Sequence, residues 1–184
     1  MLTPPQSQRD QGIAAVSAAD IRWLRCDLKA TSLLANCLLR QMAVSAGCVE
    51  TVLFRDGFLT EGSASSIFVV KNGVLLAPIK NHLMLPGITY DVILELAAQH
   101  GLPHEVRDVT EAETRGADEL WMCSSTKEVL PVVTLDDIER KLDPRDVPLD
   151  NATLFEATSG GTVVERLKAR VQPWGPYLRY SYVT

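Results

Sequence analysis

The sequence predicts an α+β fold in which helices flank a mostly antiparallel β-sheet. Two dipeptides typical of two-residue hairpins, Asp56-Gly57 and Asn72-Gly73, each stand between runs with strand character. Stretches of helical periodicity lie before the first hairpin and after the second. With 184 residues, the chain is long enough to bury a hydrophobic core within one domain.

The N-terminal part is expected to contain a lead-in, an edge strand and a helix. Residues 1–17 include two consecutive prolines and few apolar side chains, which is typical of an irregular linker. An edge strand is expected over residues 21–26. A helix is expected over about 31–46, where leucines recur at helical spacing before Gly47, a suitable C-terminal residue.

Strands and two further helices are expected up to residue 135. Four strands are predicted to form an antiparallel meander: 50–55, 58–62, 67–71 and 74–77. A helix is expected over about 90–100, and Thr110 with Glu113 forms a capping box for a short helix. The remaining strands are expected at 104–109, 119–123 and 128–135. Beyond residue 135 the pattern weakens, and residues 162–171 are predicted to form a short amphipathic helix.

The composition excludes several classes of protein. The net charge is −5, and the basic residues are scattered, unlike the basic stripe of a protein that binds nucleic acid or a membrane surface. No apolar run is long enough to span a bilayer, and the N-terminus lacks the apolar core of a signal peptide. Four cysteines without a Cys-x-x-Cys pair and three dispersed histidines predict no metal site and fit the reducing cytoplasm.

Lys29 is the first candidate for chemistry. It precedes the helix expected at about 31–46 and has apolar neighbours on both sides, so we expect an extended segment to hold it at the helix entrance, with reduced hydration. A positioned amine can form a covalent bond with a carbonyl compound. Most lysines are solvated surface charges, so this stretch alone is weak support for a catalytic site.

Glu61 is the second candidate. It lies between two strand pieces and is flanked by small residues, where a solvated charge is not expected. An ordinary turn carboxylate is the simpler interpretation, and the pattern alone favours it. A buried carboxylate at this position would instead accept a hydrogen bond from a protonated ring nitrogen.

Two short segments are candidate anion sites. Residues 87–89 (Gly-Ile-Thr) begin a helix, where free N–H groups and the helix dipole attract anions. Residues 124–126 (Ser-Ser-Thr) follow a strand and offer N–H and O–H donors. A plain helix cap and a serine-rich loop are the commoner explanations. Together, however, one amine, one buried acid and two donor turns are what pyridoxal 5′-phosphate requires of a protein.

Four segments together resemble the fold-type IV, class IV pyridoxal-phosphate aminotransferases. They are RWLRCDLKATSLLAN, TEGSASSIFVVKNGVLLAP, LMLPGITYDVILELA and ELWMCSSTKEVLPV, in the family's order and roughly its spacing over about residues 20–135. The resemblance implies a barrel-like core of mostly antiparallel strands. It also implies a linker remnant (1–17), a cofactor-binding domain (18–135) and a divergent C-terminal segment (136–184).

The resemblance also implies roles for individual residues. Lys29 would bind the cofactor covalently and move a proton between the substrate Cα and the cofactor. Glu61 would keep the cofactor's ring nitrogen protonated, and Arg22 would orient nearby acidic groups. The other cofactor contacts implied by the family are Ser65, Ser66, Leu85, Ile88, Thr89 and Ser125.

Within the family, residues 29–36 and the TEGSASSIF stretch are similar to the D-amino acid aminotransferases. Leu34 stands where branched-chain enzymes usually carry a tyrosine. The implied activity moves an amino group between an amino acid and a 2-oxo acid, and the implied assembly is a homodimer. A lyase of the aminodeoxychorismate type is one alternative.

The chain also departs from the family pattern. Full-length members have an N-terminal domain ahead of the lysine segment, and that domain supplies a phosphate-binding arginine. Tyr90 stands where an arginine usually follows the Gly-Ile-Thr motif. Loss of activity is therefore one expectation. A second alternative is a non-catalytic, truncated domain that binds a partner chain through the apolar surface where the missing domain would pack.

Overall fold

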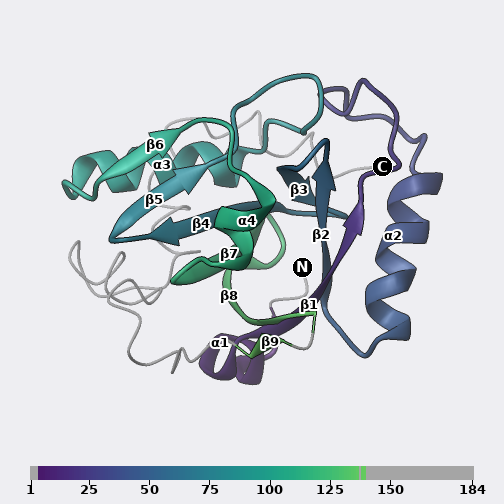
Figure 1. The fold of residues 1–184 in the computed structure, drawn as a ribbon, viewed down its shortest axis with the longest axis horizontal. Coiled ribbons are helices and arrows are strands. Elements are labelled where there is room, and N and C mark those ends of the chain that lie inside the picture. The colour runs from purple at the N-terminus through teal and green to yellow at the C-terminus, as the bar shows by residue number, and fades with distance from the viewer. Residues whose placement is uncertain (1–3, 137, 140–184) are drawn as a thin grey trace, which may run out of the picture. The chain divides into compact units, whose positions relative to one another are not determined.

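The computed structural model describes residues 4–136, 138 and 139, whose fold is shown in Figure 1. The helices are α1 (Gln6–Gln11), α2 (Leu34–Ser45), α3 (Ile88–Gln99) and α4 (Glu111–Arg115). The strands are β1 (Ile13–Ala19), β2 (Glu50–Arg55), β3 (Phe58–Gly62), β4 (Ser66–Lys71), β5 (Val74–Ala77), β6 (His104–Val106), β7 (Glu119–Ser124), β8 (Glu128–Leu135) and β9 (Ile138–Glu139). The described residues belong to the first of two compact units, Met1–Val147. The helix predicted at 162–171 lies outside them.

One curled sheet contains all of these strands. Their order is β3-β2-β1-β8-β7-β4-β5-β6, with β9 paired to β8. Among the described strands, the pairs β1–β2, β1–β8 and β5–β6 are parallel, and the remaining pairs are antiparallel. The α+β class with a mostly antiparallel sheet is therefore confirmed.

The two ends of the sheet approach one another after β6. An isolated antiparallel bridge joins Phe58 in β3 to Thr110. The N–H of Leu59 donates to the carbonyl of Val109 at 2.8 Å. These contacts curl the sheet toward closure, as expected for a barrel-like core.

Both predicted hairpins are present, but the predicted meander is wrong. Asp56 and Gly57 have φ values of 51° and 83°, and Asn72 and Gly73 have 51° and 75°. Positive φ at both central residues matches the right-handed twist of the flanking strands. However, β4 pairs with β7 and β5, while β3 lies at the other end of the strand order. The hairpin turns specify each local pair and leave the placement of the two pairs to long-range contacts.

β1 lies within the sheet, which corrects two predictions. Residues 1–17 were expected to be a linker, yet they contain α1 and most of β1. The edge strand expected at 21–26 is wrong, because these residues form bends and turns. β1 pairs in parallel with both β2 and β8. Its four alanines are weak strand formers, so pairing on both sides, rather than local propensity, stabilises this strand.

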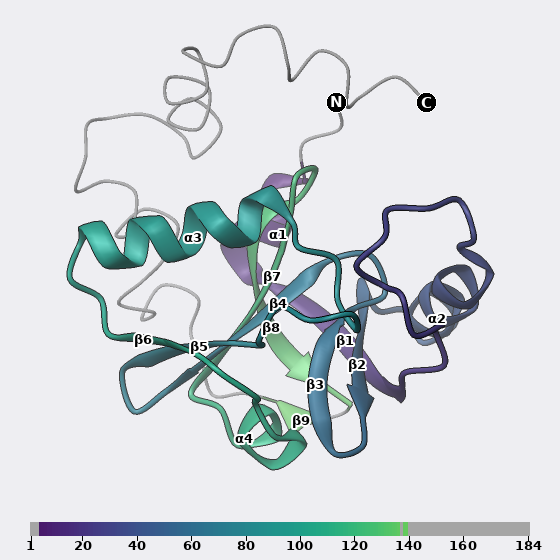
Figure 2. The same cartoon turned by 90° about the horizontal axis from the view of Figure 1, so that it is seen from above.

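The main hydrophobic core is formed by the strands of the curled sheet themselves, since all of its buried residues except Val109 belong to strands. Its fully buried side chains include Val52, Ile67, Val69, Leu120, Leu130 and Val132. α2 packs against β1 and β2, while α3 packs against β6 and β7, so the two helices cover different parts of the sheet (Figure 2). In the described part of the chain, no helix has the length and apolar character needed to cross a membrane.

Candidate functional site

A buried cluster of charged groups joins the segment after β1 to β3. Glu61 is 6 % exposed, and its carboxyl group binds the buried guanidinium group of Arg22. The N–H of Leu85 lies 3.2 Å from each carboxyl oxygen of Glu61. Arg22 Nε also donates to Asp20 at 2.9 Å, and its Nη2 donates to the carbonyl of Leu83 at 2.9 Å. Three residues predicted for the site, Arg22, Glu61 and Leu85, therefore meet in one network.

The environment of this network shifts the pKa values of its members in different directions. Burial raises the pKa of Glu61 to about 7, against the opposing effects of the Arg22 charge and the Leu85 N–H. Burial also disfavours the charged form of Arg22, but its bonds to Asp20 and Glu61 outweigh this effect and raise its pKa. Burial of Asp20 is likewise outweighed by Arg22, so the pKa of Asp20 is lowered. Glu61 is thus the member of this network whose charge changes near neutral pH.

The start of β4, the start of α3 and the end of β7 form a second meeting point. Ser66 pairs with Cys123, two residues before Ser125. A Cβ atom added to Gly87, the N-cap of α3, would lie 3.7 Å from Ser66 Oγ. Gly87 offers no side chain to cap the helix, so the first N–H groups of α3 are available to a ligand. Three segments far apart in the sequence therefore contribute polar groups to one region.

The predicted phosphate donors differ in exposure. Ile88 and Ser125 are exposed, and Thr89 is half-buried. Ser125 lies in the turn between β7 and β8, where Ser124 Oγ accepts a hydrogen bond from the N–H of Lys127 at 3.1 Å. An exposed turn and an uncapped helix start can both donate to a bound anion.

Lys29 lies in the irregular segment between β1 and α2. Its side chain is exposed, and so are its apolar neighbours, so the prediction that they reduce its hydration is wrong. Hydrogen bonds anchor the segment on both sides of the lysine. The N–H of Cys26 donates to the carbonyl of His82 at 2.8 Å, and Asn36 Nδ2 donates to the carbonyl of Ser63 at 2.9 Å. The lysine is therefore tethered to the loop before Leu85 and to the turn after Glu61.

Three residues of this region were not predicted from the sequence. Asp20 and Arg55 complete the Arg22 network, since Arg55 Nη2 donates to the carbonyls of Asp20 and Arg22 at 3.1 and 2.7 Å. Glu50, which is 1 % exposed, binds Ser63 and Ser65. Glu50 could have been noticed in the sequence, because it is a charged residue at the start of the apolar strand ETVLFR.

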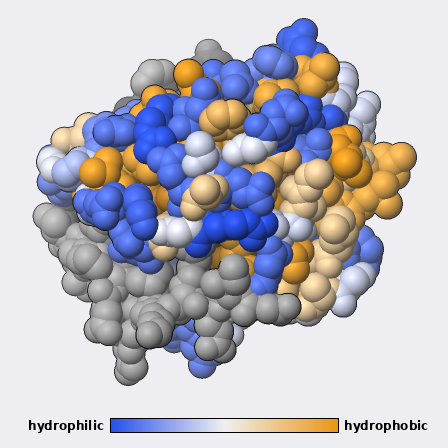
Figure 3. Space-filling model, in the orientation of Figure 1, coloured by the Kyte–Doolittle hydropathy of each residue, from blue (hydrophilic) through white to orange (hydrophobic). Residues whose placement is uncertain are grey.

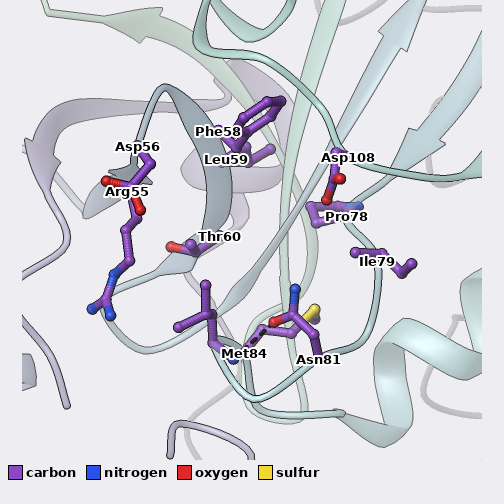
Figure 4. A pocket seen from close by; sticks show the side chains of 11 residues that line it. Arg55, Asp56, Phe58, Leu59, Thr60, Pro78, Ile79, Asn81, Met84 and Asp108 are labelled. Atoms are coloured by element: carbon purple, nitrogen blue, oxygen red, sulfur yellow. Dashed lines mark hydrogen bonds between the residues drawn. The ribbon is translucent and has the colours of Figure 1, made fainter. Parts of the chain in front are cut away.

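A cavity of about 130 Å³ borders the Arg22 network at Arg55 and Leu83, between β3 and the loop after β5 (Figure 4). Arg55 and Thr60 line one side, and Pro78, Asn81 and Met84 line the other. None of the residues predicted for the site lines this cavity. The cavity therefore adjoins the Arg22 network without including a residue predicted for the site.

Known proteins share both the sequence and the fold of this chain. The family described as Amino-transferase class IV matches residues 1–135. The D-alanine aminotransferase of Bacillus licheniformis is 40% identical over 132 residues, which are 72% of this chain and 47% of that protein. The D-alanine aminotransferase of Listeria innocua is 36% identical over 137 residues, 73% of this chain and 47% of that protein. The chain therefore spans about half the length of the curated relatives that it matches.

A solved structure of a transaminase has a similar fold to this chain. The fold IV-transaminase CpuTA1 from Curtobacterium pusillum matches with a TM-score of 0.71 and 28% identity, covering 82% of this chain and 55% of that one. The matched family region, residues 1–135, includes the curled sheet up to β8 and every residue predicted for the site. The chain belongs to the class IV aminotransferases.

Proposed function

We propose that this chain acts in a pyridoxal-phosphate-dependent aminotransferase of the D-amino acid type, which moves an amino group between an amino acid and a 2-oxo acid. The observation that carries this proposal is the buried Arg22–Glu61 pair, closed by the N–H of Leu85, in a chain 40% identical to a D-alanine aminotransferase. We also propose a cytoplasmic location, which suits the free thiols of Cys26, Cys37 and Cys123.

The donor set of the chain fits pyridoxal 5′-phosphate. Lys29 provides an exposed amine that can react with an aldehyde. The first N–H groups of α3, together with the hydroxyls of Thr89 and Ser125, would hold the phosphate. The remaining contacts to the cofactor would come from Ser65, Ser66, Leu85 and Ile88. When bound, the cofactor supplies an electron sink for the negative charge that develops at the substrate Cα.

The chain's own residues would hold and move protons around this group. Glu61 would hold a proton at the ring nitrogen, because its burial favours a shared proton and its two oxygens are already oriented by Arg22 and Leu85. The long, flexible side chain of Lys29 would carry a proton to and from the substrate Cα. Arg22 would orient Glu61 through the bonds that it also makes with Asp20 and Leu83.

Spectroscopy and an activity assay test this proposal together. After addition of pyridoxal 5′-phosphate, the purified chain is expected to gain the visible absorption band of a lysine-bound cofactor. With D-alanine and 2-oxoglutarate it is expected to form pyruvate and glutamate faster than with L-alanine. Absence of both the band and turnover would contradict the proposal. Release of pyruvate from aminodeoxychorismate without an amino acceptor would instead identify the lyase alternative.

An exposed apolar surface also favours binding to a partner chain. In α2 only Leu39 and Ala43 are buried. We use the term α2 surface for the apolar side chains of α2 and of the segment before it that are between 46 % and 76 % exposed: Ile21, Trp23, Leu24, Leu28, Leu33, Leu34, Leu38, Met42 and Val44. Figure 3 shows apolar residues gathered on the side where Figure 1 places α2. A surface of this kind promotes association, and we propose that a second copy of the chain covers it.

A charge placed in the α2 surface tests the proposed homodimer. Leu38→Glu is expected to lower the dimer fraction at least tenfold, because association would bury an unpaired carboxylate. Val106→Glu is the matched control, since Val106 is a similarly exposed apolar residue on β6. Sedimentation velocity over a range of concentrations measures both variants. A parent chain that stays monomeric but binds a different protein chain through this surface would favour the non-catalytic alternative.

A further inference from the structure

Glu50 is a buried acid to which the proposed reaction gives no role. It begins β2, and its carboxyl group accepts hydrogen bonds from three groups of the turn after Glu61. The N–H of Ser63 donates to Oε1 at 3.1 Å, and the Ser63 hydroxyl binds the same oxygen. Ser65 Oγ donates to Oε2 at 2.7 Å. The N–H of Thr51 also donates to Oε1, at 2.8 Å. Both carboxyl oxygens are thus used as acceptors.

The turn that Glu50 binds has little space for another conformation. It joins Glu61 directly to Ser65, and the N–H of Gly62 donates to the carbonyl of Ser65 at 2.6 Å. A Cβ atom added to Gly62 would lie 2.3 Å from Ser65 Oγ and 3.1 Å from the carboxyl carbon of Glu50. The carboxyl group therefore packs directly against the backbone that determines where Glu61 and Ser65 lie.

The same turn is attached to the helix that follows Lys29. Asn36, in the first turn of α2, donates to the carbonyl of Ser63 at 2.9 Å. One turn further along, Arg40 Nη1 lies 3.6 Å from Glu50 Oε1 and donates to the carbonyl of Val49. Glu50 therefore lies where the turn after Glu61 and the helix after Lys29 are joined.

We propose that Glu50 is a positioning residue of the cofactor site, which holds the Glu61 turn and the Lys29 segment in register with each other through Ser63, Ser65 and Arg40. The proposal rests on the proposed function of that site. Glu50 acts through these neighbours, and the effect of its loss is expected to be confined to the two segments that it joins.

Hydrogen exchange of the chain without cofactor tests whether Glu50 joins the Glu61 turn to the Lys29 segment. Glu50→Ala is expected to raise exchange at least tenfold in peptides covering residues 28–36 and 61–66. Glu50→Gln is expected to restore most of the protection, because the amide oxygen still accepts from Ser63 and the amide nitrogen can donate to Ser65 Oγ. Glu119→Ala is the control, since Glu119 is also a buried acid and its carboxyl group accepts a hydrogen bond from Trp121 Nε1 in β7. If Glu50→Ala raised the exchange rate uniformly over the whole sheet, or did not raise it in residues 28–36, Glu50 would not join these two segments.

Cofactor titration separates this inference from the function on which it rests. If the parent binds pyridoxal 5′-phosphate, Glu50→Ala is expected to weaken binding at least tenfold, with recovery in Glu50→Gln and no change in Glu119→Ala. Unchanged affinity in Glu50→Ala would overturn the positioning role and leave the proposed function standing. A parent that binds no cofactor would contradict the proposed function, while the exchange result would still decide whether Glu50 joins the two segments.

Discussion

Replacing Lys29 with alanine is expected to abolish the visible absorption band of the bound cofactor and to reduce transamination by a factor of about 10² to 10⁴ or more. We expect this because the Lys29 amine is proposed to have two roles: it binds the cofactor and it moves the proton of the substrate Cα. Because the side chain is exposed and its segment is held by the backbone of Cys26 and by Asn36, the fold is expected to be unaffected. A spectral titration with cofactor and a urea unfolding curve measure the two effects.

Lys71→Ala is the matched control for this experiment. Lys71 ends β4 next to the hairpin turn, whereas Ser66 begins the same strand near the candidate site. At about 3.3 Å per residue, the two positions are about 17 Å apart. Lys71→Ala is expected to keep the absorption band and the activity. A full band in Lys29→Ala, or its loss in Lys71→Ala, would show that another lysine binds the cofactor.

Replacing Glu61 with glutamine is expected to lower kcat/KM about 10- to 100-fold, with a smaller effect on folding. The neutral amide has nearly the same shape, but it cannot form a charge-assisted bond with a protonated ring nitrogen, and such a bond contributes about 1.5–3 kcal/mol. Arg22 keeps Asp20 as a partner, so its charge stays compensated. Steady-state kinetics with D-alanine and 2-oxoglutarate provide the measurement.

The same variant is expected to change how stability depends on pH. The pKa of Glu61 is about 7 in the folded chain, against 4.5 for an unperturbed glutamate. Between these values the unfolded carboxyl group has lost its proton while the folded one retains it, so the free energy of unfolding falls as the pH rises from about 4.5 to 7. The decrease attributed to this group is about 3 kcal/mol. Glu61→Gln lacks it.

Urea unfolding at several pH values between 4.5 and 8 measures this difference between the parent and Glu61→Gln. Titrating groups outside the Arg22 network are common to both chains, so their contributions cancel in the comparison. Gln99→Ala, which changes an exposed and uncharged side chain at the end of α3, is the control and is expected to follow the parent. Parallel curves for the parent and Glu61→Gln would show that Glu61 is ionised in the folded chain throughout this range.

Features that depend on a few neighbouring residues were predictable. The turns at Asp56-Gly57 and Asn72-Gly73 formed because Asp, Asn and Gly tolerate the positive φ that such hairpins need. The capping box of Thr110 and Glu113 formed because both partners lie within one helical turn. Local chemistry alone was sufficient for these elements.

Features that depend on distant segments were not predictable in the same way. β1 was missed because its alanine-rich sequence has little strand propensity, and parallel pairing with β2 and β8 stabilises it. The meander was wrong because β4 pairs with β7, whose residues lie about 50 positions further along the chain. Lys29 was expected to lose hydration, but its apolar neighbours face outward in the described chain.

The candidate site combines both kinds of information. Residue types made Lys29, Glu61 and the two donor segments candidates, although simpler interpretations were favoured for each of them, and the family resemblance implied their roles. The burial of Glu61, its contacts with Arg22 and Leu85, and the position of Glu50 under the adjoining turn depend on how the sheet curls. These contacts join groups up to 39 residues apart, and their free energy comes from desolvation and packing, which no local pattern records.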